Sequence, residues 1–176
     1  MNIQKADYGT IIQFGSMQDL KYKLQLDGKT LDEVIDTVDA NGISLLEKCL
    51  TARKFDIAKE LLDHNAKVNV ITEDGCNEFH CIASNIRCEG ALDIAKKLLE
   101  RETSLEVKDK KYGNSALFTL CLELMNDCSD EEMKFLEDCM GKTHEYDDCN
   151  KAGFNLRRLI KERGTERLRQ MMEDVQ

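Results

Sequence analysis

The sequence predicts an all-α fold, a solenoid of stacked helix–turn–helix units that occupies the 176 residues as one domain. A two-part pattern recurs four times: a polar turn with a glycine and a short apolar helix, followed by a second amphipathic helix. The glycines of successive turns are 33, 38 and 40 residues apart, and periods of this length are typical of solenoid proteins. The chain has no proline and only 10 glycines, which argues against a turn-dense β-sandwich. The glycines that define the period are Gly42, Gly75, Gly113 and Gly153.

The first segment, residues 1–38, is predicted to be a degenerate N-terminal cap. Residues 15–24 have the apolar spacing of a second helix, Gly28 interrupts it, and residues 31–35 return to an apolar patch. A terminal unit is expected to be atypical because one of its sides faces water. Residues 1–8 alternate in polarity and lack the apolar core of a signal peptide, so we expect a cytoplasmic protein with reduced thiols.

The second helix of each later unit carries an apolar pair, two polar residues and another apolar pair. This pattern is clear at 56–62 and 93–99 and looser at 135–140 and 168–172. Apolar residues at i, i+1, i+4 and i+5 form one wide stripe of a helix, which must be buried against a neighbour. Three full units and a C-terminal cap follow, which we place at 39–71, 72–108, 109–148 and 149–176.

The later units are longer than the first full unit. We expect the extra residues between the two helices of a unit, at 86–89 and around 126–130. A solenoid accepts inserts in such a loop because they leave the stacking surfaces of the helices unchanged.

The period and the order of the parts resemble the ankyrin repeat over residues 39–172, and more weakly over 10–38. His80 matches the histidine that ends the family's helix-start signature, and Phe79 matches its leucine. The proline of that signature is replaced in each unit, by Leu45, Glu78 and Ala116. The tetratricopeptide repeat has a similar period, but its Trp/Leu-Gly/Tyr pattern is missing here. One gapless unit matches the family at Asp39, Gly42, Ser44, Leu46, Ile57, Leu61, Leu62, Ala66 and Asn69.

The resemblance implies a protein-binding module, because ankyrin repeats bind other proteins in a concave groove lined by the turn tips and the first helices. Ile43, Tyr112 and Phe154 are large apolar or aromatic residues at expected tips, and such residues anchor interfaces. The alternative is that each packs on its neighbouring turn. The size and acidity of the chain are also similar to those of stand-alone ankyrin-type bacterial immunity proteins. The candidate contact residues in the groove are Asn41, Ile43, Glu73, Asp74, Cys76, Lys111, Tyr112, Asn114 and Phe154.

The charge distribution suggests a second candidate surface. The chain has 25 basic and 34 acidic residues, a net charge of −9, and residues 109–148 hold 4 basic and 11 acidic residues. We expect this acidic segment to steer a basic protein partner, such as a toxin or a nuclease, toward the chain. The alternative is a solvated face that maintains solubility. The acidic residues are Asp127, Asp130, Glu131, Glu132, Glu137, Asp138, Glu145, Asp147 and Asp148, of which Glu131, Glu132, Glu137 and Asp138 are the candidate contact residues.

Several other classes of function are disfavoured. Nucleic acid is an unlikely partner for a chain with a pI near 4.9 and 6% aromatic residues, because phosphate binding depends on Lys and Arg. The longest apolar stretch, 116–125, is too short to span a membrane. No motif for catalysis or a cofactor is present, and His80 and Cys81, adjacent on a helix, point about 100° apart. We expect a protein that is not an enzyme and is a monomer when free.

The eight cysteines allow one alternative function. No pair has the Cys-x-x-Cys spacing of zinc ribbons or thioredoxin-like sites. Cys49, Cys121 and Cys139 fall on apolar helical faces, where cysteine acts as a small hydrophobic residue. The alternative is a metal- or thiol-responsive sensor that uses Cys76, His80, Cys81 and Cys88.

Overall fold

The computed structural model describes residues 1–125 and 128–174, and its regular secondary structure is almost entirely helical, with loops and turns between the helices. Within these ranges β-structure is limited to two isolated bridges, one between Val38 and Ser44 and one between Lys108 and Ser115. The described helices, in chain order, are α1 (Tyr8–Phe14), α2 (Met17–Asp27), α3 (Leu45–Thr51), α4 (Phe55–Asp63), α5 (Glu78–Ala83), α6 (Ala91–Glu100), α7 (Ala116–Leu124), α8 (Asp130–Met140), α9 (Leu156–Arg163) and α10 (Glu166–Asp174).

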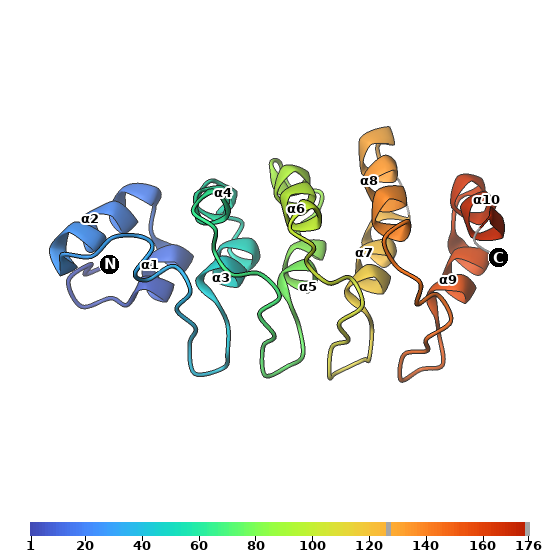
Figure 1. The fold of residues 1–176 in the computed structure, drawn as a ribbon, viewed down its shortest axis with the longest axis horizontal. Helices are drawn as coiled ribbons and strands as arrows, with labels where there is room; N and C mark the ends of the chain where they lie inside the picture. The colour runs from blue at the N-terminus through green and yellow to red at the C-terminus, as the bar shows by residue number, and fades with distance from the viewer. Residues whose placement is uncertain (126–127, 175–176) are drawn as a thin grey trace.

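The helices form pairs that stand side by side along the long axis of the molecule, with the two termini at opposite ends (Figure 1). The first helices α3, α5, α7 and α9 lie in one layer, and the second helices α4, α6, α8 and α10 lie in another. Long hairpin loops extend from the first-helix layer and point to the same side. The predicted all-α stack of helix–turn–helix units is confirmed.

Each first helix after the N-terminal unit begins in the same way. A Ser or Asn side chain at the N-cap accepts a hydrogen bond from the backbone N–H three residues later, which satisfies a donor that has no partner inside the helix. The repeated cap fixes where each hairpin ends and the helix begins. The cap residues are Ser44, Asn77, Ser115 and Asn155, with donors at Glu47, His80, Phe118 and Arg158.

The N-terminal unit also contains a helix pair, of which the sequence indicated only the second helix. That helix, α2, begins with a capping box between Ser16 and Asp19 and ends at Gly28, which adopts a left-handed φ of 62°. The first helix, α1, is only seven residues long, and it buries Ile11 and Ile12 completely. Contact with α3 stabilises a segment that is too short to be helical alone.

One continuous apolar cluster runs through all of the helix pairs. The predicted stripes of the second helices lie in it, for example at Ile57 and Leu61 of α4. Cys49, Cys121 and Cys139 are fully buried there, as expected, and burial raises the pKa of each thiol far above its usual range.

The extra spacing between Gly75 and Gly113 is divided between two places. The loop between α5 and α6 covers residues 84–90, whereas only residues 52–54 separate α3 from α4. The prediction that all extra residues lie between the helices is nevertheless wrong, because the hairpin closed by Asp109 and Asn114 is one residue longer than the hairpin closed by Asp39 and Ile43. The second expected insert includes residues 126 and 127, which lie outside the described residues.

Candidate protein-binding surface

Four hairpins, which we call fingertips, form the edge of the stack: residues 39–43, 72–76, 109–114 and 150–154. In each, the N–H of the first residue donates to the carbonyl of the last, at 2.7 to 3.0 Å. The glycine inside each fingertip has a φ between 71° and 78°, which side chains other than glycine rarely adopt. The predicted turn glycines therefore determine the shape of this edge.

Neighbouring fingertips are joined by backbone hydrogen bonds. In each bond, the second residue of one fingertip donates its N–H to a carbonyl of the preceding fingertip. The accepting residue stands directly before the glycine of that fingertip. The result is a hydrogen-bonded ladder across four successive units, which holds the fingertips in fixed relative positions. The three bonds run from Glu73 to Asn41 at 3.0 Å, from Lys110 to Asp74 at 2.7 Å, and from Lys151 to Tyr112 at 2.9 Å.

Side chains inside the fingertips reinforce the same shape. Asp39, Asp109 and Asn150 each accept two backbone N–H groups of their own hairpin, so these polar groups are satisfied within the turn. In the second fingertip, the Thr72 hydroxyl accepts the N–H of Cys76. Because the turns are internally satisfied, the remaining fingertip side chains are available for other contacts.

The candidate fingertip residues divide into two groups by exposure. Asn41, Glu73, Asp74, Lys111 and Tyr112 are exposed, and Tyr112 presents 56% of its surface. The others, Ile43, Cys76, Asn114 and Phe154, are half-buried.

The three expected apolar anchors therefore differ from one another. Tyr112 is exposed, as predicted. Phe154 is half-buried: it packs against the core cluster, and its ring centre lies 4.1 Å from the guanidinium carbon of Arg158 in α9. Ile43 is half-buried, and its N–H donates to the Asp39 carboxylate.

A groove lies on the first-helix side, under the third and fourth fingertips, and the candidate residues Lys111, Tyr112, Asn114 and Phe154 are part of its lining. Sequence reasoning missed the residues that α7 and α9 add to this lining. The groove has a volume of about 400 Å³ and is lined by α7, α9 and the two hairpins. On α7, Leu117, Leu120, Cys121 and Leu124 form the buried stripe. Phe118 and Leu122 are spaced i, i+4 on a different face, and that spacing was the available signal.

The acidic residues fall into two places: Asp148 lies beside the third and fourth fingertips, where it pairs with Lys108, and the candidate contact residues lie apart from the fingertips. Glu131, Glu132, Glu137 and Asp138 belong to α8, in the second-helix layer on the opposite side of the stack (Figure 1). Asp127 lies outside the described residues. The structure thus provides two separate candidate surfaces and does not combine them into one.

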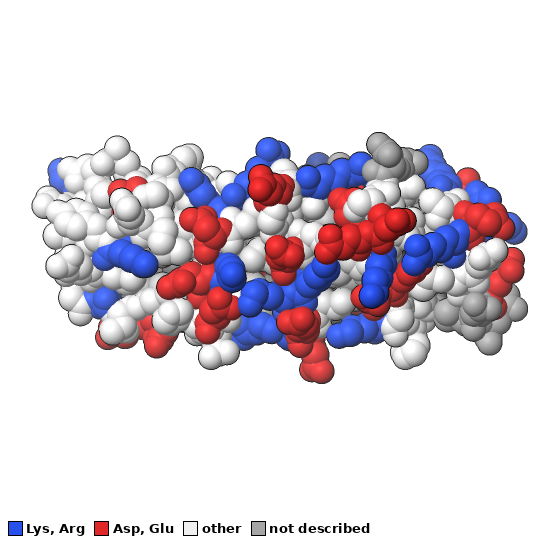
Figure 2. All heavy atoms as spheres, turned by 90° about the horizontal axis from the view of Figure 1, so that it is seen from above, with Lys and Arg blue, Asp and Glu red and all other residues white. Residues whose placement is uncertain are grey.

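Much of the acidic charge is already engaged within the chain. Glu131 pairs with Lys96 at 2.5 Å, Glu137 pairs with Arg167, and Glu132 accepts the N–H of Ser129 in a capping box. Seen from the second-helix side, acidic and basic side chains alternate over the surface (Figure 2). Among the described residues, Asp138 is exposed and has no ion pair, and Glu132 is engaged only in its capping box.

His80 has a structural role. Its Nδ1 accepts the backbone N–H of Asn77 at 3.3 Å, and its Nε2 lies 3.3 Å from the carbonyl of Asn114, which it reaches as a donor. Burial lowers the pKa of the imidazole, so the neutral ring is favoured. His80 thereby connects α5 to the third fingertip.

The alternative of a metal sensor is not supported by the geometry. Among the described residues, no group of three or more His, Cys, Asp or Glu side chains could hold a metal ion, so Cys76, His80, Cys81 and Cys88 do not form a site. Burial raises the pKa of Cys81 to about 12 and also raises that of Cys76, which disfavours reactive thiolates at both positions. The expectation failed because helical neighbours point in different directions.

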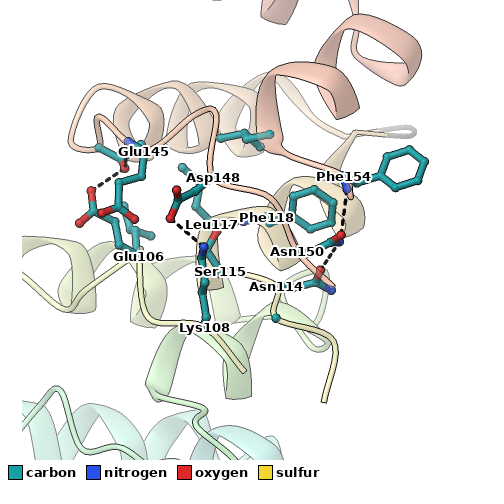
Figure 3. A pocket seen from close by; sticks show the side chains of 14 residues that line it. Glu106, Lys108, Asn114, Ser115, Leu117, Phe118, Glu145, Asp148, Asn150 and Phe154 are labelled. Carbon is teal, nitrogen blue, oxygen red and sulfur yellow. Dashed lines mark hydrogen bonds and ion pairs between the residues drawn. The ribbon is translucent and has the colours of Figure 1, made fainter. Parts of the chain in front are cut away.

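The small cavity beside the third and fourth fingertips is part of the packing between units and is not a ligand site (Figure 3). Its free volume is about 10 Å³, roughly the room that one water needs. Polar pairs between successive units surround it: Lys108 with Asp148 at 2.7 Å, Thr143 with Glu106 at 2.7 Å, and Asn150 with Asn114 at 2.7 Å. These contacts fix the position of the fourth fingertip relative to the third.

No family model matches the chain. A protein of Rickettsia bellii (strain RML369-C) described as an ankyrin repeat protein is 21% identical over 162 residues, which are 85% of this chain and 23% of that protein. The chain therefore spans about a quarter of the length of the curated relative that it matches. No described helix is long and apolar enough to cross a membrane.

A solved structure has the same fold. It is the complex of the predatory endopeptidase Bd0816 from Bdellovibrio bacteriovorus with the immunity protein Bd3460. One of its chains matches with a TM-score of 0.70 at 16% identity, over 96% of this chain and 80% of that chain. The helix pairs, the fingertips and these two likenesses confirm the resemblance to ankyrin repeats and the predicted fold class, an ankyrin-repeat solenoid.

Proposed function

We propose that this chain, an ankyrin-repeat solenoid, is a non-catalytic module that binds another protein and acts as an inhibitor of the immunity-protein type. The observation that carries the proposal is the fingertip ladder: hydrogen bonds fix the backbone of the edge while the side chains of Asn41, Glu73, Asp74, Lys111 and Tyr112 remain exposed. The solved complex that shares the fold contains an immunity protein and an endopeptidase, which supports a partner of the enzyme class.

The physical basis is preorganisation. A flexible loop loses conformational entropy when it binds, at about 0.5–1.5 kcal/mol for each immobilised side chain. The fingertip backbone is already ordered by bonds within and between the hairpins, so that the remaining loss is confined to side chains. A rigid surface of this kind is suited to covering a partner's active site without chemistry of its own.

The nature of the partner is a finer part of the proposal. The net charge of −9 and the exposed acidic residues of α8 favour a basic partner, such as a toxin or a nuclease, that is attracted to the acidic side before docking. We propose that the contact surface itself lies on the fingertips and first helices, and that the acidic residues Asp130 and Asp138 act at longer range.

The proposal is tested by binding and inhibition together. The chain is used as bait for extracts at low salt, the recovered protein is purified, and its affinity is measured by calorimetry beside an assay of the partner's own activity. We expect nanomolar binding, inhibition at a one-to-one ratio, and a loss of affinity of at least about tenfold for the fingertip variant Tyr112→Ala.

Tyr22→Ala, at an exposed tyrosine on α2, serves as the matched control and should bind like the unmodified chain. Two outcomes would contradict the proposal: the absence of any protein partner at low salt, or a partner that binds tightly but keeps its full activity.

A further inference from the structure

The groove under the third and fourth fingertips contains exposed apolar surface. Phe118 forms part of its floor and is only 7% exposed, whereas Leu122 and Tyr112 are 37% and 56% exposed and line the same groove. Burial of such side chains contributes about 25 cal/mol for each Å² removed from water. This surface is therefore suited to receiving a large apolar side chain.

The charge around the groove is opposite to that of the chain as a whole. Its lining includes Lys111, Lys151 and Arg163 and no carboxylate, although the chain carries a net charge of −9. Within the described residues, none of these three cations has a recorded ion pair. The Lys111 ammonium lies 4.8 Å from the ring centre of Tyr112, and the Lys151 ammonium donates to the carbonyl of Lys110.

An apolar floor with an uncompensated basic rim defines what can bind. Because the inference rests on the proposed protein-binding function, we propose that this groove binds an acidic segment of the partner, a stretch in which a large apolar residue stands next to Asp or Glu. The apolar side chain enters between Leu122 and Tyr112, and the carboxylates form charge-assisted hydrogen bonds with the rim cations.

The side chains that line the groove favour a polypeptide over a single-stranded nucleic acid. Successive bases need several aromatic rings as stacking platforms. Here Tyr112 supplies an exposed ring, while Phe118 is buried and Phe154 is covered by Arg158. The aliphatic side chain of Leu122 matches an apolar residue better than a base.

A library of random linear peptides displayed on phage tests the proposal. Peptides are selected on the unmodified chain and then depleted on the variant Leu122→Asp, whose fold is checked by circular dichroism. We expect the remaining peptides to be enriched in Phe, Leu or Tyr next to Asp or Glu. Enrichment in Lys and Arg, or equal recovery on both proteins, would overturn the proposal.

A titration with a defined peptide probe measures how much the basic side chains of the groove contribute to binding. The probe is a fluorescein-labelled peptide with a central Phe and Leu flanked by Asp residues, beside the same peptide with Lys in place of Asp. The double variant Lys111→Glu/Lys151→Glu should weaken binding of the acidic probe about tenfold or more, while Lys134→Glu on α8 should change it less than about twofold. Equal binding of both probes contradicts the proposal, as does displacement of the acidic probe by a single-stranded DNA oligonucleotide.

The two proposals can fail separately. If the groove variants bind and inhibit the captured partner as the unmodified chain does, the groove is not the contact, and the inhibitor function stands. If no partner is inhibited while the acidic probe still binds in the groove, the inhibitor function fails and the groove's specificity stands.

Discussion

Glu47 is an ionisable residue buried in the core between two units. Its side chain is 0% exposed, its Oε2 accepts the N–H of Ser44 at 2.7 Å, and no hydrogen-bond donor to its Oε1 is found among the described residues. Burial raises the pKa of this carboxyl from 4.5 to about 7. Glu47 therefore keeps its proton in the folded state at pH values where the unfolded chain has released it.

The raised pKa predicts a stability that falls as the pH rises. Below 4.5, Glu47 is protonated in both states and its ionisation costs nothing; between 4.5 and about 7 only the unfolded state ionises, so folding stability decreases, and above about 7 the loss is complete. Glu47→Gln keeps an acceptor for Ser44 but cannot ionise. We expect the variant to be more stable than the unmodified chain at pH 8, by roughly 2 kcal/mol, and nearly equal at pH 4.5.

Urea unfolding followed by circular dichroism at the two pH values measures this difference. Glu100→Gln, at an exposed site on α6, is the control and should change stability little at either pH. A stability difference for Glu47→Gln that is the same at both pH values would show that ionisation is not its cause.

The fingertips are the elements that sequence reasoning located best, because their turns need a residue with a left-handed φ, and glycine is the residue that adopts it readily. The helix α1 and the longer third fingertip were missed. Residues 8–14 form only about two helical turns, which is too short a segment to establish a helical period, and they become helical through contact with α3. The extra fingertip residue leaves the pattern of the helices unchanged, so an insert between helices explained the spacing equally well.

The candidate binding surface could be predicted from the sequence only in part. The exposed positions at 41, 73, 74 and 111–112 followed from the fingertip pattern. The part of the groove that α7 lines did not follow from the sequence. Leu122 belongs to a run of apolar residues, and its exposure depends on which face of α7 meets the neighbouring helices. The pairing of Glu131 with Lys96 also depends on residues 35 positions apart, which no local pattern joins.

Replacing a fingertip glycine by alanine can destabilise the fold through backbone strain and through a steric clash of the new Cβ, and two of the glycines allow these two effects to be separated. Gly75 and Gly153 both have positive φ, of 78° and 76°. A Cβ at Gly75 would lie 2.9 Å from the carbonyl oxygen of Lys108, whereas nothing lies within 4 Å of a Cβ at Gly153. Gly153→Ala should therefore cost only the backbone term, about 1–2 kcal/mol, and Gly75→Ala should cost more, because the ladder must also move.

Thermal unfolding of the two variants decides the comparison. A melting temperature that falls equally for Gly75→Ala and Gly153→Ala would show that the close approach of Lys108 to Gly75 adds no cost. Circular dichroism at low temperature checks that both variants keep the helical content of the unmodified chain.

In the molecule as a whole, the acidic residues of α8 and the proposed contact surface on the fingertips lie on different sides of the stack. Helix α8 lies in the layer opposite the fingertips, and two of its acidic residues, Glu131 and Glu137, pair with Lys96 and Arg167. Such a distribution influences how fast a partner arrives more than how tightly it is held. The basic rim of the groove then acts at close range, on a local segment of the partner.

Association kinetics with the captured partner test the long-range effect. Asp138→Lys reverses an exposed charge that caps no helix, and it should slow association with a basic partner at low salt, with a smaller change in the dissociation rate. Lys134→Glu, on the same helix, should change the association rate in the opposite direction. An association rate that is the same for both variants would argue that the acidic surface only maintains solubility.

The ladder also has a consequence for solvent accessibility over time. The amide protons of Glu73, Lys110 and Lys151 lie in loops at the edge of the molecule, yet each is held by the carbonyl of the preceding hairpin. In deuterated water these three amides should exchange slowly, while that of the exposed Lys111 beside them exchanges within seconds, as loop amides do. The margin of the protein would then show alternating protected and labile positions at the spacing of the repeat, and uniform rapid exchange would mean that its loops move independently.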